Sequence, residues 1–380
     1  MTGAMYAAIS GLKSHMTKLN VIGNNIANVN TYGYKSARTT FRETIYTTLT
    51  AGSGGTDVTG GINPNQIGYG CNIGTIDLDM SNGPAVPTGI NLDCMIQGDG
   101  FFLIGDKGGV DVDSLNSLMM SKVGDFDFDE DGYLVDGAGN IVYGFLTVNG
   151  TITKDQTTNV ETFKPSTNPG SGTNTNGDGG TGISTQLVPI RLPLAAAADD
   201  TNVPPLYEAG DPIYPGVNAD GTNTGTDESG GIPVNGRVSV NIDSLKIESS
   251  GKIVATSENG DVITIGYVAL GKVENPAGLN HLNGPYYQAG GSAGDLSITS
   301  AAGGVSGYLN NPADPNNPGA NAVRIVGSDN SLLSGFLEGS GTDLATEFSE
   351  MITTQRGYQA NTRIVTVTDT MLEELVNMKR

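Results

Sequence analysis

The sequence predicts a mainly β protein with α-helical coiled-coil termini: discontinuous, nested β domains plus a paired N- and C-terminal helical domain. Three observations favour this fold class. Apolar residues recur every seven positions near both ends. Between the ends, short apolar runs alternate with Gly, Asn and Asp turn signals. Glycine accounts for 56 of the 380 residues and Trp is absent, a composition that suits strands joined by many turns.

The first helix is predicted over residues 4–28, which contain no Pro. Its apolar residues fall on interleaved seven-residue tracks, a pattern typical of coiled-coil positions a and d. These residues are Met5, Leu12, Leu19 and Ile26, with Ile9 and Met16 between them. Glycines at positions 3, 11 and 23 weaken the helix when it is alone.

The second helix is predicted over residues 343–378, which contain no Pro and one Gly. One seven-residue track is wholly apolar: Leu344, Met351, Tyr358, Val365 and Leu372. The interleaved track is mostly polar: Phe348, Gln355, Thr362, Asp369 and Val376. We expect the apolar track to form a dry contact with the first helix, and the polar track to face an inner surface or a wet contact between subunits.

Neither terminal helix is expected to be stable alone, because an isolated amphipathic helix leaves its apolar stripe in water. Packing of each helix on a globular core is one solution. Heptads at both ends of an otherwise β-like chain favour another, in which the helices pair with each other and with neighbouring chains.

The pattern divides the chain into four parts. A terminal coiled-coil domain is expected at 1–30 with 342–380, and a linker at 31–65. An inner β domain is expected at 66–145 with 239–341, and an inserted outer β domain at 146–238. Polar low-complexity stretches at 165–182, 218–231 and 310–321 are expected to be exposed loops.

Charge and composition exclude several classes of function. The chain has 19 basic and 40 acidic residues, a net charge of −21, which argues against nucleic acid or an anionic membrane as partner. No apolar run reaches the length of a membrane span, and the N-terminus lacks the pattern of a secretory signal, so we expect a cytoplasmic protein or export without a cleaved signal. The Cys and His residues are too few and scattered for a structural zinc site: Cys71, Cys94, His15 and His281.

An acidic run at 127–131 resembles the opening of a calcium-binding loop. The closing Glu is missing, because Ala138 occupies its position, and Phe126 and Phe128 alternate with Asp in the manner of a strand. We therefore expect a strand followed by a turn. No catalytic, cofactor-binding or metal site is predicted, and the chain is not expected to be an enzyme.

Two terminal segments resemble the bacterial flagellar axial proteins, the family of rod and hook subunits. The first, at 24–35, carries Asn24, Asn25, Asn28, Asn30, Thr31, Gly33 and Tyr34, although Tyr32 stands where many members have Pro. The second, at 351–361, carries Gln355, Arg356, Tyr358 and Asn361. Interior stretches at 92–102, 124–135 and 268–279 also resemble the family, and the motifs occur in its order.

This resemblance implies a tubular helical homopolymer outside the cell, in the hook or basal body of the flagellum. It implies export by the flagellar type III machinery, terminal helices that are disordered in the monomer, and contacts with the distal rod, hook cap and hook–filament junction proteins. Distal rod members are considerably shorter, so the insertion favours a hook subunit. A distal rod-type subunit and, from another class, a secreted enzyme or carbohydrate-binding protein remain alternatives.

Overall fold

The computed structural model describes residues 2–55, 60–106, 118–146, 150–154, 161–165, 187–196, 212–213, 234–239, 242–257, 262–301, 307–308, 324–327 and 330–378. The chain forms two compact units. Unit 1 comprises Met1–Ser81 and Ser340–Arg380, and unit 2 comprises Asn82–Gly339. Unit 1 is therefore assembled from both terminal regions of the sequence, and unit 2 is inserted between them.

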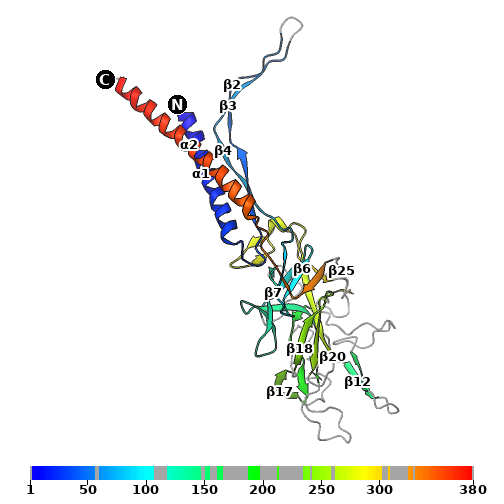
Figure 1. The fold of residues 1–380 in the computed structure, drawn as a ribbon. Helices are drawn as coiled ribbons and strands as arrows, with labels where there is room; N and C mark the ends of the chain where they lie inside the picture. Colours follow the sequence, from blue (N-terminus) through cyan, green and yellow to red (C-terminus); the bar gives the residue numbers. More distant parts are fainter. Residues whose placement is uncertain are drawn as a thin grey trace. The chain divides into compact units, whose positions relative to one another are not determined.

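Unit 1 contains the two predicted helices, α1 (Thr2–Ala27) and α2 (Leu344–Met378), which pack side by side and antiparallel (Figure 1). Asp343 caps the start of α2, because its carboxylate accepts hydrogen bonds from the backbone N–H of Ala345 at 3.0 Å and the hydroxyl of Thr346 at 2.7 Å. The prediction of mainly β structure with paired terminal helices is confirmed.

A long antiparallel ribbon lies beside α1 in unit 1. Its strands are β1 (Ala37–Glu43), β2 (Tyr46–Thr50), β3 (Asn65–Gly68) and β4 (Cys71–Leu78), with β1 paired to β4 and β2 to β3. Backbone hydrogen bonds from Thr44 to Gly70 and from Tyr69 to Ile45 join the two pairs end to end. The linker predicted at 31–65 is therefore wrong, since Thr-rich segments there form paired strands.

Unit 2 is built around one large, mostly antiparallel sheet. Its path over the described residues runs β21-β22-β8-β7-β11-β20-β23-β25-β24, with β9, β10, β14, β18 and β19 attached beside it. The bounds are β7 (Phe101–Gly105), β8 (Met119–Ser121), β9 (Phe126–Phe128), β10 (Leu134–Asp136), β11 (Ile141–Leu146), β14 (Val188–Pro189), β18 (Ile242–Ile247), β19 (Lys252–Ser257), β20 (Val262–Lys272), β21 (Asn280–His281), β22 (Tyr286–Gln288), β23 (Ser297–Ser300), β24 (Gly307–Tyr308) and β25 (Arg324–Gly327).

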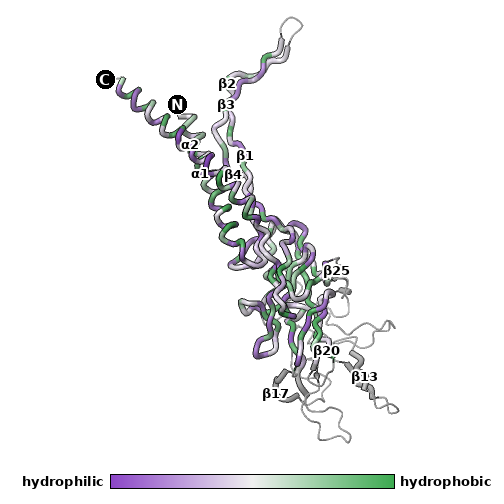
Figure 2. The backbone as a smooth tube through the Cα atoms, in the orientation of Figure 1, coloured by the Kyte–Doolittle hydropathy of each residue, from purple (hydrophilic) through white to green (hydrophobic). Residues whose placement is uncertain are grey.

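The hydrophobic core of unit 2 lies on this sheet. Every residue of β11 is buried, as are most residues of β7 and β20, and the tube near the β20 label is largely hydrophobic in Figure 2. Phe102 and Phe126 meet edge to face with ring centroids 4.9 Å apart. Cys94 is also fully buried in this core, and its thiol is free.

Smaller strand pairs complete unit 2. They are β5 (Ala85–Pro87) with β27 (Phe336–Glu338), β6 (Cys94–Gln97) with β26 (Ser331–Ser334), β12 (Gly150–Lys154) with β13 (Glu161–Pro165), and β15 (Leu194–Ala196) with β16 (Pro212–Ile213) and β17 (Val234–Ser239). A single 3-10 turn, η2, covers Pro276–Gly278 among the described residues. Because β5 pairs with β27, the chain enters and leaves unit 2 through adjacent strands.

The predicted domain limits need two corrections. Residues 66–81 belong to unit 1, because β4 pairs with β1. Within the described part of 146–238, β14 pairs with β11, and Ile190 and Leu192 lie in the core of unit 2, so these residues do not belong to a separate outer domain. The segments expected to be loops at 218–231 and 310–321, and nearly all of 165–182, lie outside the described residues.

The strand and turn predicted at the acidic run are confirmed. β9 pairs with β10, and the turn between them is closed by a hydrogen bond from the backbone N–H of Gly132 to the carbonyl of Asp129 at 2.9 Å. The Asp129 carboxylate accepts the backbone N–H of Tyr133 at 2.7 Å. In the described structure the Asp129 side chain therefore stabilises a turn.

Candidate assembly interface

The seam between α1 and α2 is narrow because glycines lie in it. A Cβ on Gly11 would lie 2.7 Å from Nδ2 of Asn361, and a Cβ on Gly357 would lie 2.8 Å from Cε1 of His15. The two contacts are four residues apart on each helix and run in opposite directions, as an antiparallel pair requires. The Lys18 ammonium and the Glu350 carboxylate extend the register with an ion pair of 3.0 Å.

The buried face of α1 differs from the predicted apolar tracks. Ala8, Gly11, Ser14, Ile22 and Asn25 are buried. The predicted residues are half-buried, except Met16, which is 52% exposed: Met5, Ile9, Leu12, Leu19 and Ile26. Small side chains allow the helix to approach its neighbours closely, so this stripe, and not the largest residues, is buried within the chain.

The less exposed face of α2 agrees only in part with the predicted apolar track. Met351, Tyr358 and Val365 are half-buried, whereas Leu344 and Leu372 are exposed. The other less exposed positions on this helix include Glu347, Thr354, Asn361, Thr362 and Thr368. Of the mostly polar track, Phe348, Gln355, Asp369 and Val376 are exposed. The dry apolar contact predicted between the helices is therefore wrong, because polar and small side chains fill much of the seam.

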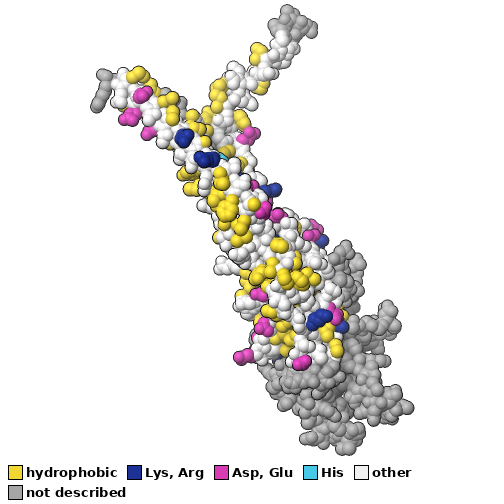
Figure 3. Space-filling model, viewed as in Figure 1, with side chains coloured by type: hydrophobic (Ala, Val, Ile, Leu, Met, Phe, Trp, Pro, Cys, Tyr) yellow, Lys and Arg dark blue, Asp and Glu magenta, His cyan; other side chains and the backbone are white. Residues whose placement is uncertain are grey.

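A second apolar stripe on α2 is exposed to solvent. It is formed by exposed residues at helical spacing: Ile364, Val367, Met371, Leu375 and Met378. Phe348 is 50% and Val376 68% exposed elsewhere on the helix. Figure 3 shows apolar side chains along the helices on the face that it draws. The seven-residue spacing of Ile364, Met371 and Met378 is a signal of this stripe that the sequence prediction missed.

Asn25 connects three elements of unit 1 and is only 1% exposed. Its Nδ2 donates to the carbonyl of Ala37 at 2.9 Å and to Oε1 of Glu347 at 2.8 Å. Its Oδ1 accepts from the backbone N–H of Ala37 and from the hydroxyl of Tyr34, both at 3.0 Å. The end of α1, the start of β1 and the first turn of α2 are thereby held together by one side chain.

The other residues of the N-terminal motif form the turn that follows α1. Asn28 Nδ2 donates to the carbonyl and side-chain oxygens of Asn24, both at 3.0 Å, and its Oδ1 accepts from Thr31 at 3.1 Å. Gly33 has a φ of 67°, which other residues rarely adopt, so the chain can reverse there. Asn30 is exposed at the tip of this turn.

Two residues of the C-terminal motif point outward instead of into the seam. Gln355 and Arg356 are exposed on α2, whereas Tyr358 and Asn361 are half-buried. The motif therefore contributes one face to the pairing of the helices and leaves another free for contacts outside the chain.

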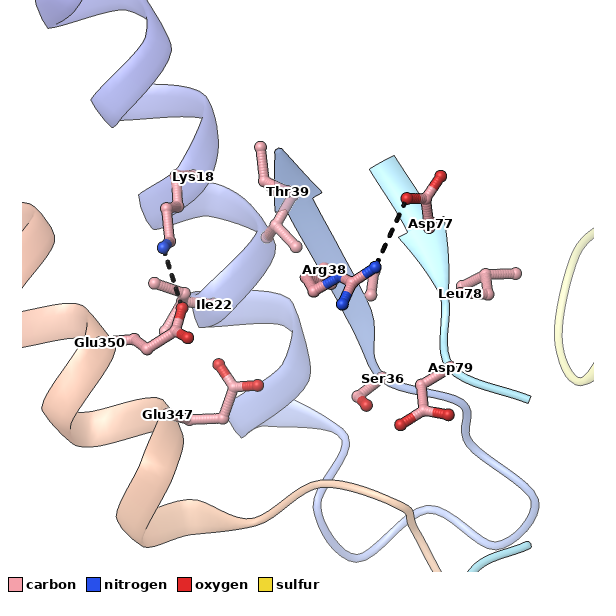
Figure 4. A pocket seen from close by; sticks show the side chains of 12 residues that line it. Lys18, Ile22, Ser36, Arg38, Thr39, Asp77, Leu78, Asp79, Glu347 and Glu350 are labelled. Carbon is pink, nitrogen blue, oxygen red and sulfur yellow. Dashed lines mark ion pairs between the residues drawn. The ribbon is translucent and has the colours of Figure 1, made fainter. Parts of the chain in front are cut away.

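A pocket opens where α1, α2, β1 and β4 meet (Figure 4). Its charged residues are Lys18, Arg38, Asp77, Asp79, Glu347 and Glu350. Lys18 pairs with Glu350 at 3.0 Å, and Arg38 approaches Asp77 at 3.9 Å. Burial raises the pKa of Glu347, whereas hydrogen bonds from Ser81 lower the pKa of Asp79.

The described residues bring together no group of three or more Cys, His, Asp or Glu side chains suited to a metal ion. Cys71 is half-buried in unit 1 and free. Across the same part of the chain, neither helix combines the length and the apolar content needed to cross a bilayer.

Two protein families match the parts of the chain that contain the N-terminal and C-terminal motifs. A family described as "Flagella basal body rod protein" matches residues 5–35, and one described as "Flagellar basal body rod FlgEFG protein C-terminal" matches residues 333–378. The chain is similar to the flagellar basal-body rod protein FlgG of Bacillus subtilis (strain 168), with 31% identity over 380 residues and 100% of both chains covered.

Hook proteins are also similar over nearly the full length. The flagellar hook protein FlgE of Borreliella burgdorferi is 28% identical over 470 residues, with 100% of both chains covered. FlgE of Salmonella typhimurium is 27% identical over 423 residues, covering 98% of this chain and 99% of the relative. The paired terminal helices and these matches define an axial structural subunit of the bacterial flagellum. The chain belongs to the flagellar rod and hook protein family.

Proposed function

We propose that the chain is the structural subunit of a flagellar hook, polymerising into a flexible tube that transmits torque from rod to filament. The observation that carries this proposal is the exposed apolar stripe on α2, from Ile364 to Met378. An exposed stripe at helical spacing is stabilised when a neighbouring helix covers it. In a polymer the neighbour is the next subunit, and contact between two different faces generates a filament instead of a closed ring.

The assembly surface combines the predicted and the newly observed positions. We include the exposed or half-buried residues of both helices: Met5, Ile9, Leu12, Met16, Leu19, Ile26, Leu344, Phe348, Met351, Tyr358, Val365, Leu372 and Val376. Other axial proteins and the type III export machinery are the further partners of this surface, and the assembled tube lies outside the cell. The role is mechanical and non-catalytic.

A mechanical role places different demands on the two units. The helices of unit 1 bury a continuous face when they pack in a tube, which resists torsion. Outer β surfaces rich in Gly, Asn and Thr can slide past one another with small changes in free energy as the hook bends. Replacing residues 165–182 with a bulky apolar segment is expected to raise the bending rigidity of the hook.

A rod subunit is the second candidate, and the similarity to a basal-body rod protein over the whole chain favours it. The two are distinguished by electron microscopy of isolated hook–basal bodies that carry an epitope tag on this chain. Label along the curved segment outside the outer rings supports the hook proposal. Label confined to the straight segment below it overturns the hook proposal and supports the rod.

Polymerisation itself is tested with the purified chain. We expect tubes at high protein concentration or under crowding, and no tubes after removal of residues 1–28, because α2 then loses its partner. Carbohydrate binding without polymer formation under the same conditions would favour the secreted binding protein instead.

A further inference from the structure

We propose that the pocket between α1, α2, β1 and β4 binds an arginine side chain of a second copy of this chain, supplied by the face of α2 that carries Arg356 and Arg363. The inference rests on the proposed function as a self-assembling subunit. It specifies one contact of that assembly and the charges that form it.

The charges of the pocket do not balance. Four carboxylates line it, from Asp77, Asp79, Glu347 and Glu350, against the two lining cations Lys18 and Arg38 and a third cation, Lys35, whose charge acts on Asp79. The Lys18–Glu350 ion pair and the Arg38–Asp77 contact use one carboxylate each. The pocket therefore attracts a further positive charge.

Two oxygen atoms in the pocket lack hydrogen-bond donors. Glu347 Oε1 accepts from Asn25, but its Oε2 is buried with no hydrogen-bond partner among the described residues. The hydroxyl of Thr39 is likewise buried and unpartnered in that part of the chain, and Thr39 is only 9% exposed. Figure 4 shows the Glu347 carboxylate directed from α2 into the space between the helices and the ribbon. Because burying an unpaired polar oxygen is costly, the site favours a ligand with several N–H donors.

A guanidinium group fits this chemistry better than a metal ion. It is planar, carries five N–H donors and is more weakly hydrated than an ammonium, so it suits a partly buried carboxylate. No group of three or more potential metal ligands converges in the described structure. The two pocket cations are held at other carboxylates, and their approach leaves Glu347 Oε2 without a donor.

The donor must come from another chain. Arg356 and Arg363 are exposed on α2 and make no ion pair among the described residues. They are seven residues apart and so share one face of the helix. At about 100° per residue, that face lies roughly one third to one half of a turn around the helix from Glu347 and Glu350. The arginine face and the pocket are therefore different surfaces of one subunit, as a non-closing contact requires.

The test compares the critical concentration for polymerisation of the full chain and its variants. Glu347→Gln removes the charge but keeps an oxygen that accepts from Asn25. Arg356→Glu and Arg363→Glu reverse the charge on the opposite face, where exposure makes loss of folding a minor concern. Asp243→Asn, on an exposed strand of unit 2, and Arg42→Glu, on the ribbon, serve as matched controls for charge.

We expect Glu347→Gln and at least one arginine variant to raise the critical concentration by about tenfold or more, since unpairing a buried charge weakens association strongly. The controls should polymerise like the unmodified chain. Equal critical concentrations for all variants would overturn the arginine contact but not the proposed function, whereas failure of the unmodified chain to polymerise would overturn both.

Discussion

The side-chain amide of Asn25 donates a 2.8 Å hydrogen bond to the carboxylate of Glu347, which lies 322 residues away in the sequence. The bond joins the last turn of α1 to the first turn of α2. Asn25 also satisfies both backbone groups of Ala37, so the same side chain fixes the start of the ribbon. A motif residue therefore has a defined role within unit 1, apart from any contact between subunits.

Replacing Asn25 with Ala is expected to destabilise unit 1 by about 1–3 kcal/mol, because buried donors and acceptors at Ala37 and Glu347 lose their partner. Thermal unfolding followed by circular dichroism should show earlier loss of the helical signal. Asn30→Ala, at an exposed position of the same motif, is the matched control and should leave that transition in place. Equal transitions in both variants would contradict the structural role of Asn25.

Glycine positions on α1 should respond in opposite directions. Gly23→Ala adds a Cβ that meets nothing within 4 Å, so it should stabilise α1 by about 0.8–1 kcal/mol through helix propensity. Gly11→Ala places a Cβ 2.7 Å from Nδ2 of Asn361, so the Asn361 side chain or the helix itself must shift, which offsets the gain in helix propensity. Helix melting temperatures of the two variants measure the difference, and a gain at Gly11 equal to that at Gly23 would rule out the close seam.

The helix pair should lose stability in mild acid through His15. Burial, and then the charge of Lys18, lowers the pKa of His15 below 6.5. As pH falls through 6.5, the unfolded chain binds a proton that the folded seam resists, so the free energy of unfolding decreases down to the folded pKa. Burial acts in the opposite sense at Glu347, whose raised pKa adds stability as pH falls further.

His15→Gln isolates the histidine contribution. Unfolding of the unmodified chain and of this variant should be compared between about pH 5 and pH 8, the range in which histidine titrates. The loss of stability below pH 6.5 should be present in the former and reduced in the latter. Parallel pH profiles would show that another group is responsible.

Leu372→Asp should leave monomer melting unchanged and abolish polymerisation. Leu372 is 38% exposed and lies beyond the last contact identified between the helices, so a charge there affects surfaces that only a neighbour covers. Asp369→Asn, on the mostly polar track, is the control and should polymerise normally. Normal tubes from Leu372→Asp would contradict assembly through the C-terminal helix.

Much of the fold could be predicted from local sequence patterns. The absence of Pro and the heptad spacing predicted both helices, and the strand and turn at Asp129 are found where the alternation of Phe and Asp placed them. The ribbon at residues 37–50 was missed because its Thr-rich strands are almost wholly exposed and carry little apolar alternation.

The face of each helix could not be predicted from residue size alone. Gly11 and Gly357 allow the helices to approach closely, so small and polar residues occupy the seam and part of the apolar surface faces outward. The pocket depends on four elements that are distant in sequence, and no local pattern brings Thr39, Asp79 and Glu347 together. Its residues become recognisable only once the antiparallel register of α1 and α2 is known.

The pairing of β5 with β27 brings the two ends of unit 2 together, so that unit 2 is an insertion with adjacent ends. Its two connections leave through neighbouring strands, so the spacing between them is set by hydrogen bonds and does not depend on how many residues lie further along the chain. Natural lengthening, shortening or exchange of the distal segments can therefore proceed without altering the ends that pair as helices. Foreign peptides for display or labelling are best inserted in those segments, because an insertion there does not alter the pairing of the terminal helices.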